Sequence, residues 1–239
     1  MFSFKRASVA GLVAAVAMAF AASAQATSFD ASLIDPPGVY FGTGNVNAHF
    51  TTNVDGNVEL GLGTVQRYIT ALTPNAGTNV YNVNTGTTSA PGRTGSDWGF
   101  VFSINTNANG NGSLTLAAIT ASICIQDVGQ GVSSCFDPLA IPDNSHASSS
   151  PTTTAQNAEA LQFNGLGTRI FLPNYDINAN DTYIFTLSAF DANRSLLNSV
   201  QSVVVAGTGA ASGVPEPLTL SLLGMGLVGL AGMRRKRSA

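Results

Sequence analysis

The 239-residue sequence has few of the side chains that most often carry catalysis, bind metals or contact anionic polymers. It contains two cysteines, two histidines and one tryptophan, and only 10% of its residues are charged. The stretch 27–213 has no lysine, and it combines four arginines with 12 of the 13 acidic residues, which leaves it a net charge of −8. Its arginines are Arg67, Arg93, Arg169 and Arg194. Because contacts to phosphate backbones need clustered cations, this composition argues against a nucleic-acid partner.

The same stretch also lacks an internal repeat of fixed period. It is rich in Gly, Asn, Thr and Ser, and its aromatic and β-branched residues come in short clusters. This pattern favours strands joined by turns over helices. The chain length fits one domain plus targeting segments. We therefore expect an all-β ectodomain over residues 27–206, folded as an antiparallel sandwich, of which a jelly roll is one form.

Three segments give the clearest strand signals. Apolar and small or polar residues alternate over Trp98–Asn105, which predicts a half-buried strand. Residues 183–190 alternate in a similar way. The apolar run that closes 200–206 predicts a buried final strand.

Other segments are less regular. The stretches 58–72 and 114–125 are long enough for bent strands or strand pairs, because their alternation breaks partway. The dipeptides Asp55-Gly56 and Asn109-Gly110 predict hairpin turns. Residues 155–161 are compatible with a short helical turn.

Residues 1–26 have the three parts of a secretory signal. Lys5 and Arg6 form the charged start, and residues 7–20 form an apolar core that is short for a membrane span. Small residues follow, so that we expect cleavage after Ala24 or Ala26. The alternative is an uncleaved N-terminal anchor.

The C-terminal part begins with a flexible linker, predicted at 207–213. The residues that follow the linker are Val214, Pro215, Glu216 and Pro217. The uncharged, mostly apolar stretch 218–233 would form a transmembrane helix of about 24 Å, which is shorter than the ~30 Å hydrocarbon core. The basic tail behind it consists of Arg234, Arg235, Lys236 and Arg237. These cations predict that the tail stays in the cytoplasm and that the ectodomain lies on the other side.

The order of Pro-Glu-Pro, apolar stretch and basic tail resembles the PEP-CTERM sorting signal over residues 214–239. Proteins with this signal are exported by Gram-negative bacteria, typically ones that make exopolysaccharide. The resemblance implies processing by an exosortase, an integral membrane cysteine transpeptidase, after signal peptidase has acted. It also implies an inner-membrane intermediate with a periplasmic ectodomain, followed by a cell-surface or extracellular location. The alternative is a plain C-terminal anchor.

The two cysteines, Cys124 and Cys135, flank a Gly-containing loop. In an oxidising compartment we expect them to form a disulfide. The alternatives are two free thiols or a thiol nucleophile. A zinc site would need more ligands than these cysteines and two distant histidines offer.

The two histidines are His49 and His146. A Ser-His-Asp site can assemble from residues far apart in sequence, but the sequence has no Gly-x-Ser-x-Gly motif. A secreted hydrolase would require one histidine to lie beside an acid and a hydroxyl group in one cleft. We expect no catalytic residue.

The best metal candidate is a run of oxygen-bearing side chains near residue 180. Oxygen ligands at alternate positions suit calcium, but the run lacks the Gly and Glu of an EF-hand loop. Because Asp and Asn also favour turns without a metal, we expect no metal and no cofactor. The residues of this calcium candidate are Asp176, Asn178, Asn180 and Asp181.

The sequence therefore predicts a non-enzymatic exported protein of the cell envelope or extracellular matrix, sorted through its C-terminal signal. The alternative is a carbohydrate-binding module for an exopolysaccharide, which would show an exposed aromatic platform. The aromatic candidates for such a platform are Trp98, Tyr81 and Tyr175.

Overall fold

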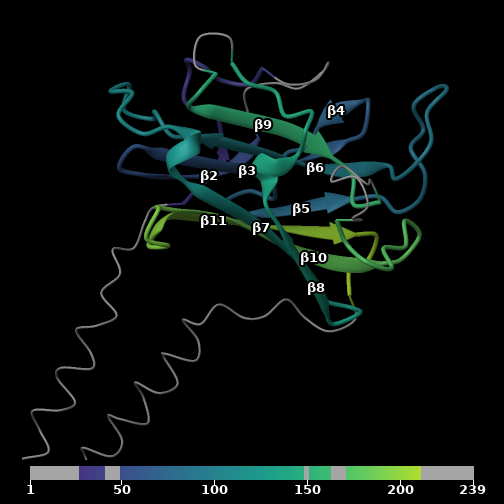
Figure 1. Cartoon of the computed structure of the whole chain (residues 1–239). Helices are drawn as coiled ribbons and strands as arrows, with labels where there is room; N and C mark the ends of the chain where they lie inside the picture. Colours follow the sequence, from purple (N-terminus) through teal and green to yellow (C-terminus); the bar gives the residue numbers. More distant parts are fainter. Residues whose placement is uncertain (1–26, 41–48, 148–150, 163–170, 211–239) are drawn as a thin grey trace, which may run out of the picture.

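The structure, a computed structural model, describes residues 27–40, 49–147, 151–162 and 171–210, which form two β-sheets packed face to face (Figure 1). The upper sheet of Figure 1 contains β1 (Ser28–Ala31), β2 (Phe50–Asp55), β3 (Val58–Gln66), β6 (Trp98–Asn105) and β9 (Thr154–Glu159) in this order, with β4 (Thr70–Ala71) beside β3. The lower sheet contains, in order, β5 (Val80–Val83), β11 (Leu196–Ala206), β10 (Asp181–Phe190), β7 (Thr120–Asp127) and β8 (Val132–Phe136). The only helices among the described residues are the short 3₁₀ helices η1 (Leu116–Ala118) and η2 (Pro138–Ala140). The predicted all-β sandwich is confirmed.

One pairing departs from the antiparallel arrangement that the sequence predicts. β5 runs parallel to β11, with Tyr81 opposite Val204, so that the lower sheet is mixed. The chain reaches β5 from the upper sheet and returns to that sheet with β6. A strand's own side chains do not encode the direction of its neighbour, which depends on this crossover. The prediction of a purely antiparallel sandwich is therefore wrong at β5.

An aromatic cluster joins the two sheets. Trp98 and Phe100 of β6 point into the sandwich and meet Tyr183 and Phe185 of β10. The ring centroids of Trp98 and Tyr183 are 5.3 Å apart, and those of Phe100 and Phe185 are 5.2 Å apart. Aromatic pairs of this kind stabilise by about 0.5–1.5 kcal/mol beyond the burial of their area.

β6 is buried on both faces, although its alternation predicts one buried face. On the face turned away from the lower sheet, Val101 packs with Leu33 and Phe50 in a second, smaller hydrophobic cluster. Alternation reports the polarity of a strand's own residues and not the presence of a covering segment from elsewhere in the chain. The prediction of a half-buried strand is therefore wrong.

The segment 27–40 supplies this cover, and buried polar side chains of the upper sheet hold it. Glu59 accepts a hydrogen bond of 2.8 Å from the backbone N–H of Ile34. The Gln156 side chain donates to the carbonyl oxygen of Gly38 at 2.8 Å and accepts from the N–H of Tyr40 at 3.2 Å. Burial raises the pKa of Glu59 above its usual value, and the hydrogen bond from Ile34 opposes the shift.

Three local predictions can be compared with the strands. The hairpin turn at Asp55-Gly56 is confirmed, because Asp55 of β2 lies opposite Val58 of β3. The Asn109-Gly110 turn closes no hairpin, since it belongs to the connection from β6 in one sheet to β7 in the other. The helical turn predicted at 155–161 is wrong, because pairing with β6 makes most of this segment the strand β9. Tertiary pairing overrides the helix propensity of so short a stretch.

Most of the predicted terminal segments lie outside the described residues. These are the signal peptide 1–26 and the sorting signal 214–239 with its predicted transmembrane helix 218–233. Within the part that the structure describes, no helix is long and apolar enough to cross a membrane.

Of the predicted linker, residues 207–210 are described, and hydrogen bonds attach them to the lower sheet. The N–H of Thr208 donates to Asn180 Oδ1 and that of Ala210 to Thr182 Oγ1, both at 3.1 Å.

Replacement of Gly99 by alanine should destabilise the sandwich. A Cβ atom at this position would clash with the backbone carbonyl oxygen of Glu159, and neither strand can yield without disturbing the β6–β9 pairing. We expect a loss of about 1–3 kcal/mol in the free energy of unfolding, measured by chemical denaturation. Gly61→Ala is the matched control, because its new Cβ atom would meet the movable end of Leu33 at 2.7 Å and should cost less. Wild-type stability in Gly99→Ala would contradict this account.

Candidate functional site

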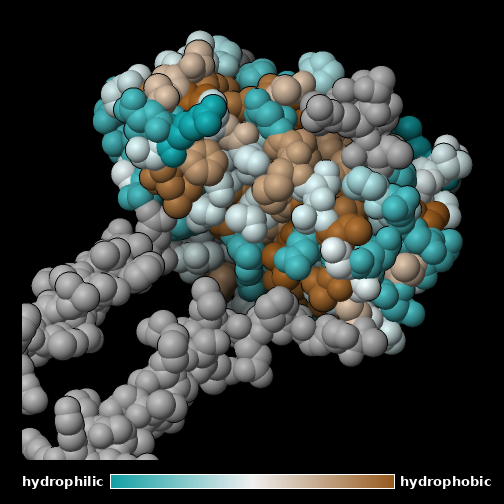
Figure 2. Space-filling model, turned by 60° about the horizontal axis from the view of Figure 1, so that its bottom comes forward, coloured by the Kyte–Doolittle hydropathy of each residue, from teal (hydrophilic) through white to brown (hydrophobic). Residues whose placement is uncertain are grey.

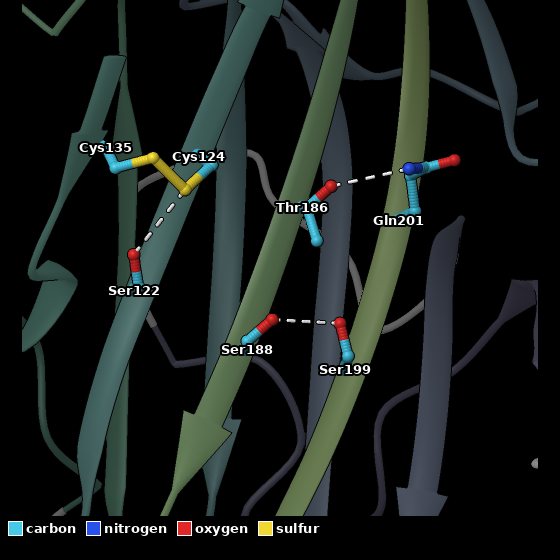
Figure 3. The surroundings of a disulfide bond; sticks show 7 residues. All are labelled: Ser122, Cys124, Cys135, Thr186, Ser188, Ser199 and Gln201. Carbon is cyan, nitrogen blue, oxygen red and sulfur yellow. Dashed lines mark hydrogen bonds between the residues drawn. A yellow bond between two sulfur atoms is a disulfide. The ribbon is translucent and has the colours of Figure 1, made fainter. Parts of the chain in front are cut away.

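The predicted disulfide is present. Cys124 of β7 and Cys135 of β8 lie directly opposite each other and are bonded (Figure 3). They are the only cysteines of the chain, so that neither is available as a thiol nucleophile in this state. A disulfide of this kind indicates an oxidising, extracytoplasmic location.

The disulfide belongs to a row of uncharged side chains on the outer face of the lower sheet. Thr186 of β10 and Gln201 of β11 continue the row, and Gln201 Nε2 donates to Thr186 Oγ1 at 3.4 Å (Figure 3). A shallow groove of about 380 Å³ lies here, and none of the side chains that line it is charged. From this side of the molecule, brown apolar residues lie among white and teal ones (Figure 2). This groove therefore offers hydrogen-bonding groups and apolar contact.

The three aromatic residues predicted as a binding platform belong to the interior. Trp98 is 2% exposed and Tyr81 is fully buried. Tyr175 is partly exposed, but its ring packs against Trp98 and Tyr183 and its hydroxyl group lies 3.0 Å from Ser96 Oγ. These residues stabilise the core, and the prediction of a platform at Trp98 or Tyr81 is wrong.

An exposed aromatic residue lies instead at Tyr68, in the turn between β3 and β4. Its side chain is 50% exposed, and its backbone adopts a φ of 65°. Two arginines approach it: the guanidinium carbons of Arg67 and Arg93 each lie 4.8 Å from the centre of the Tyr68 ring. Arg67 is only 8% exposed and donates from Nη2 to the Tyr68 hydroxyl group at 2.7 Å, whereas Arg93 is exposed. The neighbouring Ile69 is 45% exposed.

Tyr68 was missed in the sequence because it falls within a stretch expected to form bent strands or a strand pair. The alternation breaks at Thr64 and Val65 near the end of β3, and the residues that follow this strand include one of the few arginines of the chain. A turn that contains both an aromatic residue and a scarce cation is the signal that could have indicated a surface site.

Among the described residues, neither histidine forms a proton relay with an acid and a hydroxyl group. The Nδ1 atom of His49 lies 2.6 Å from Asp30 Oδ1 and 3.3 Å from Thr73 Oγ1. A relay needs the acid and the hydroxyl group on different ring nitrogens, whereas here both lie at the same one. His146 is bound through Nδ1 to the carbonyl oxygen of Thr154 at 2.6 Å.

The four residues of the calcium candidate have separate local roles. Asp176 Oδ1 accepts from the N–H of Asn178 at 2.9 Å, and Asn180 Oδ1 accepts from the N–H of Thr208. Asp181 turns inward, where its Oδ1 accepts from the N–H of Gly129 at 2.8 Å. Among the residues that the structure describes, no group of three or more acidic, histidine or cysteine side chains is arranged to hold a metal ion.

Asp181 meets a second buried carboxyl group, that of Asp127. Asp127 is fully buried at the end of β7, and Asp181 is 3% exposed at the start of β10. The N–H of Gln130 donates to Asp127 Oδ1 at 2.7 Å, and neither carboxyl group forms an ion pair with a described residue. Burial raises the pKa of Asp127 to about 6; the Gln130 hydrogen bond lowers it, and the adjacent Asp181 carboxyl raises it. One of the two acids therefore holds its proton more tightly than an exposed acid does.

The residues predicted to form the sorting signal lie outside the described part of the chain. They are Val214, Pro215, Glu216 and Pro217, followed in the basic tail by Arg234, Arg235, Lys236 and Arg237. Their assignment remains a prediction from the sequence.

Comparison with known proteins gives no relative: no protein-family model, no curated protein and no solved structure matches the chain.

Asp127→Asn should stabilise the protein at neutral pH. Because the folded-state pKa of Asp127 is raised, its protonated form favours the fold below about pH 4, and this contribution is lost as the pH rises through about 6. The neutral amide has no such loss, so that the variant should gain roughly 1–3 kcal/mol at pH 7.5 and little at pH 4. Denaturation across this pH range measures the effect.

Asp35→Asn is the matched control, because it makes the same charge change at an exposed residue. If both variants gain the same free energy of unfolding, the effect comes from net charge. If Asp127→Asn is less stable than the wild type at neutral pH, the buried pair of Asp127 and Asp181 does not destabilise the fold as proposed.

Proposed function

We propose that the chain is a non-enzymatic exported protein of the cell envelope or extracellular matrix, sorted and processed through its C-terminal signal. The observation that carries this proposal is the disulfide between Cys124 and Cys135, which agrees with export to an oxidising compartment. The two ends of the sequence support the same route, since a secretory signal precedes the domain and the order of residues 214–239 resembles a PEP-CTERM signal. The partners in this route are signal peptidase and an exosortase-type membrane transpeptidase.

The physical character of the signal suits removal after export. Pro215 and Pro217 keep the backbone extended and prevent a helix from continuing upstream. A helix over 218–233 would be short for a bilayer, so that an enzyme in the membrane meets an accessible segment just outside it. The sorting chemistry then belongs to the partner enzyme. The arrangement at His49, with acid and hydroxyl on one nitrogen, supports a non-enzymatic role for this chain.

The jelly-roll form of the sandwich is the finer part of the fold prediction. The two packed sheets are compatible with it, and we keep it as part of the proposal.

Intact-mass analysis of membrane and secreted fractions tests the sorting proposal. In cells that contain the transpeptidase, we expect a mature chain that begins after residue 24 or 26 and ends between about Pro215 and Pro217. Pro215→Ala combined with Pro217→Ala should leave the full tail in place, because the extended segment is lost. Pro142→Ala, at an exposed proline of the ectodomain, is the control and should be processed normally. A wild-type chain that keeps Arg237 in every fraction would make the tail a permanent anchor.

Carbohydrate binding is a second candidate function, and the exposed position of Tyr68 favours it. The exposed half of this side chain, together with the neighbouring Ile69, offers apolar contact to a sugar. Tyr68→Asn removes the ring while keeping a residue type that tolerates a positive φ. On a glycan array, the exported wild-type protein should bind polysaccharide and Tyr68→Asn should bind markedly less. Equal binding by the two proteins would remove Tyr68 as the contact.

A further inference from the structure

The contact between Arg93 and Tyr68 fixes a cation at the surface of an acidic domain. Arg93 lies in the connection from β5 to β6, and its guanidinium carbon is 4.8 Å from the centre of the Tyr68 ring. Because the turn at Tyr68 and the turn at Arg93 come from different connections, this contact orients a side chain that would otherwise be free to move. A cation–π contact of this type orients the guanidinium group without neutralising its charge.

Arg93 has no acidic partner among the residues that the structure describes. Its interactions there are the contact with Tyr68 and the hydrogen bond from its backbone N–H to the carbonyl oxygen of Ala90. Arg67, on the same ring, differs because it is buried and binds the Tyr68 hydroxyl group. The exposed charge at this turn is therefore that of Arg93, in a stretch whose net charge is −8.

We propose that Arg93 and Tyr68 form a binding site for a carboxylate-bearing polysaccharide. The proposal rests on the carbohydrate binding proposed above, and it names the class of sugar. Arg93 donates paired N–H groups to a carboxylate oxygen pair, and a planar guanidinium group matches this geometry. Tyr68 and Ile69, each close to half exposed, offer apolar surface to the sugar ring beside the carboxylate.

The surroundings favour such a polymer over an anionic ligand in general. Nucleic acid would need more cations than the three described arginines supply, and two of these three converge on Tyr68. A single exposed guanidinium group beside apolar surface suits a ligand whose charges are spaced along a chain of rings.

Binding of defined polymers to the mature exported protein tests the site. The probes are polygalacturonate, neutral dextran and poly-glutamate, with affinities measured by biolayer interferometry. The wild type should bind polygalacturonate more tightly than the other two. Arg93→Gln should reduce the affinity for polygalacturonate roughly tenfold or more.

Arg194→Gln is the matched control, because Arg194 is also exposed and without an ion pair among the described residues but has no aromatic contact there. It should bind like the wild type, and the thermal midpoints of both variants should show that they fold.

Equal losses of affinity in the two variants, or wild-type binding to poly-glutamate that equals its binding to polygalacturonate, would overturn the proposed site. Dextran binding that needs Tyr68 and not Arg93 would overturn the acidic class and leave carbohydrate binding standing. Failure to bind any polysaccharide would overturn both, while the sorting proposal would still depend on the intact-mass result.

Discussion

The packing of Trp98 and Phe100 against Tyr183 and Phe185 joins the two sheets, and the positions of the surface features follow from it. Trp98 pairs with Gln66, the last residue of β3, so that the buried indole ring fixes the point at which the chain turns outward at Tyr68. The same contact holds β10 in place, and Asp181 begins that strand only two residues before Tyr183. The exposed turn and the buried acid pair thus both lie within a few residues of this aromatic contact between the sheets.

The sequence was sufficient for features that depend on local pattern. The strand at Trp98–Asn105, the turn at Asp55-Gly56 and the pairing of the two cysteines could be predicted, because alternation, turn residues and compartment act on neighbouring residues or on few candidates. Features that depend on distant segments could not be predicted from the sequence. The cover over Val101 comes from a segment more than 60 residues away, and the contact of Arg93 with Tyr68 joins two separate turns.

Aromatic residues illustrate why the candidate site could not be read from residue type. Trp98, Tyr81 and Tyr68 are equally able to stack on a sugar, and the sequence favoured the first two. Burial of an aromatic side chain stabilises the fold more than burial of a smaller one, so that aromatic residues of strands tend to lie in the core. Tyr68 stays half exposed because it lies in a turn between β3 and β4 and not in a strand.

The exit of the chain from its last strand connects the proposed site with the proposed sorting. Gly207 follows β11 and lines a small pocket of about 230 Å³ together with Gln66 and Trp98. Residues 207–210 are hydrogen-bonded to Asn180 and Thr182 at the start of β10, and Gly207 lies beside Gln66, two residues before Tyr68 in the chain. If the proposed sorting holds, the tail would attach the domain close to Gly207, the end of the sandwich that also carries Gln66 and Trp98. The proposed binding at Tyr68 and the proposed removal of the tail would then concern the same end of the domain, although different residues carry them.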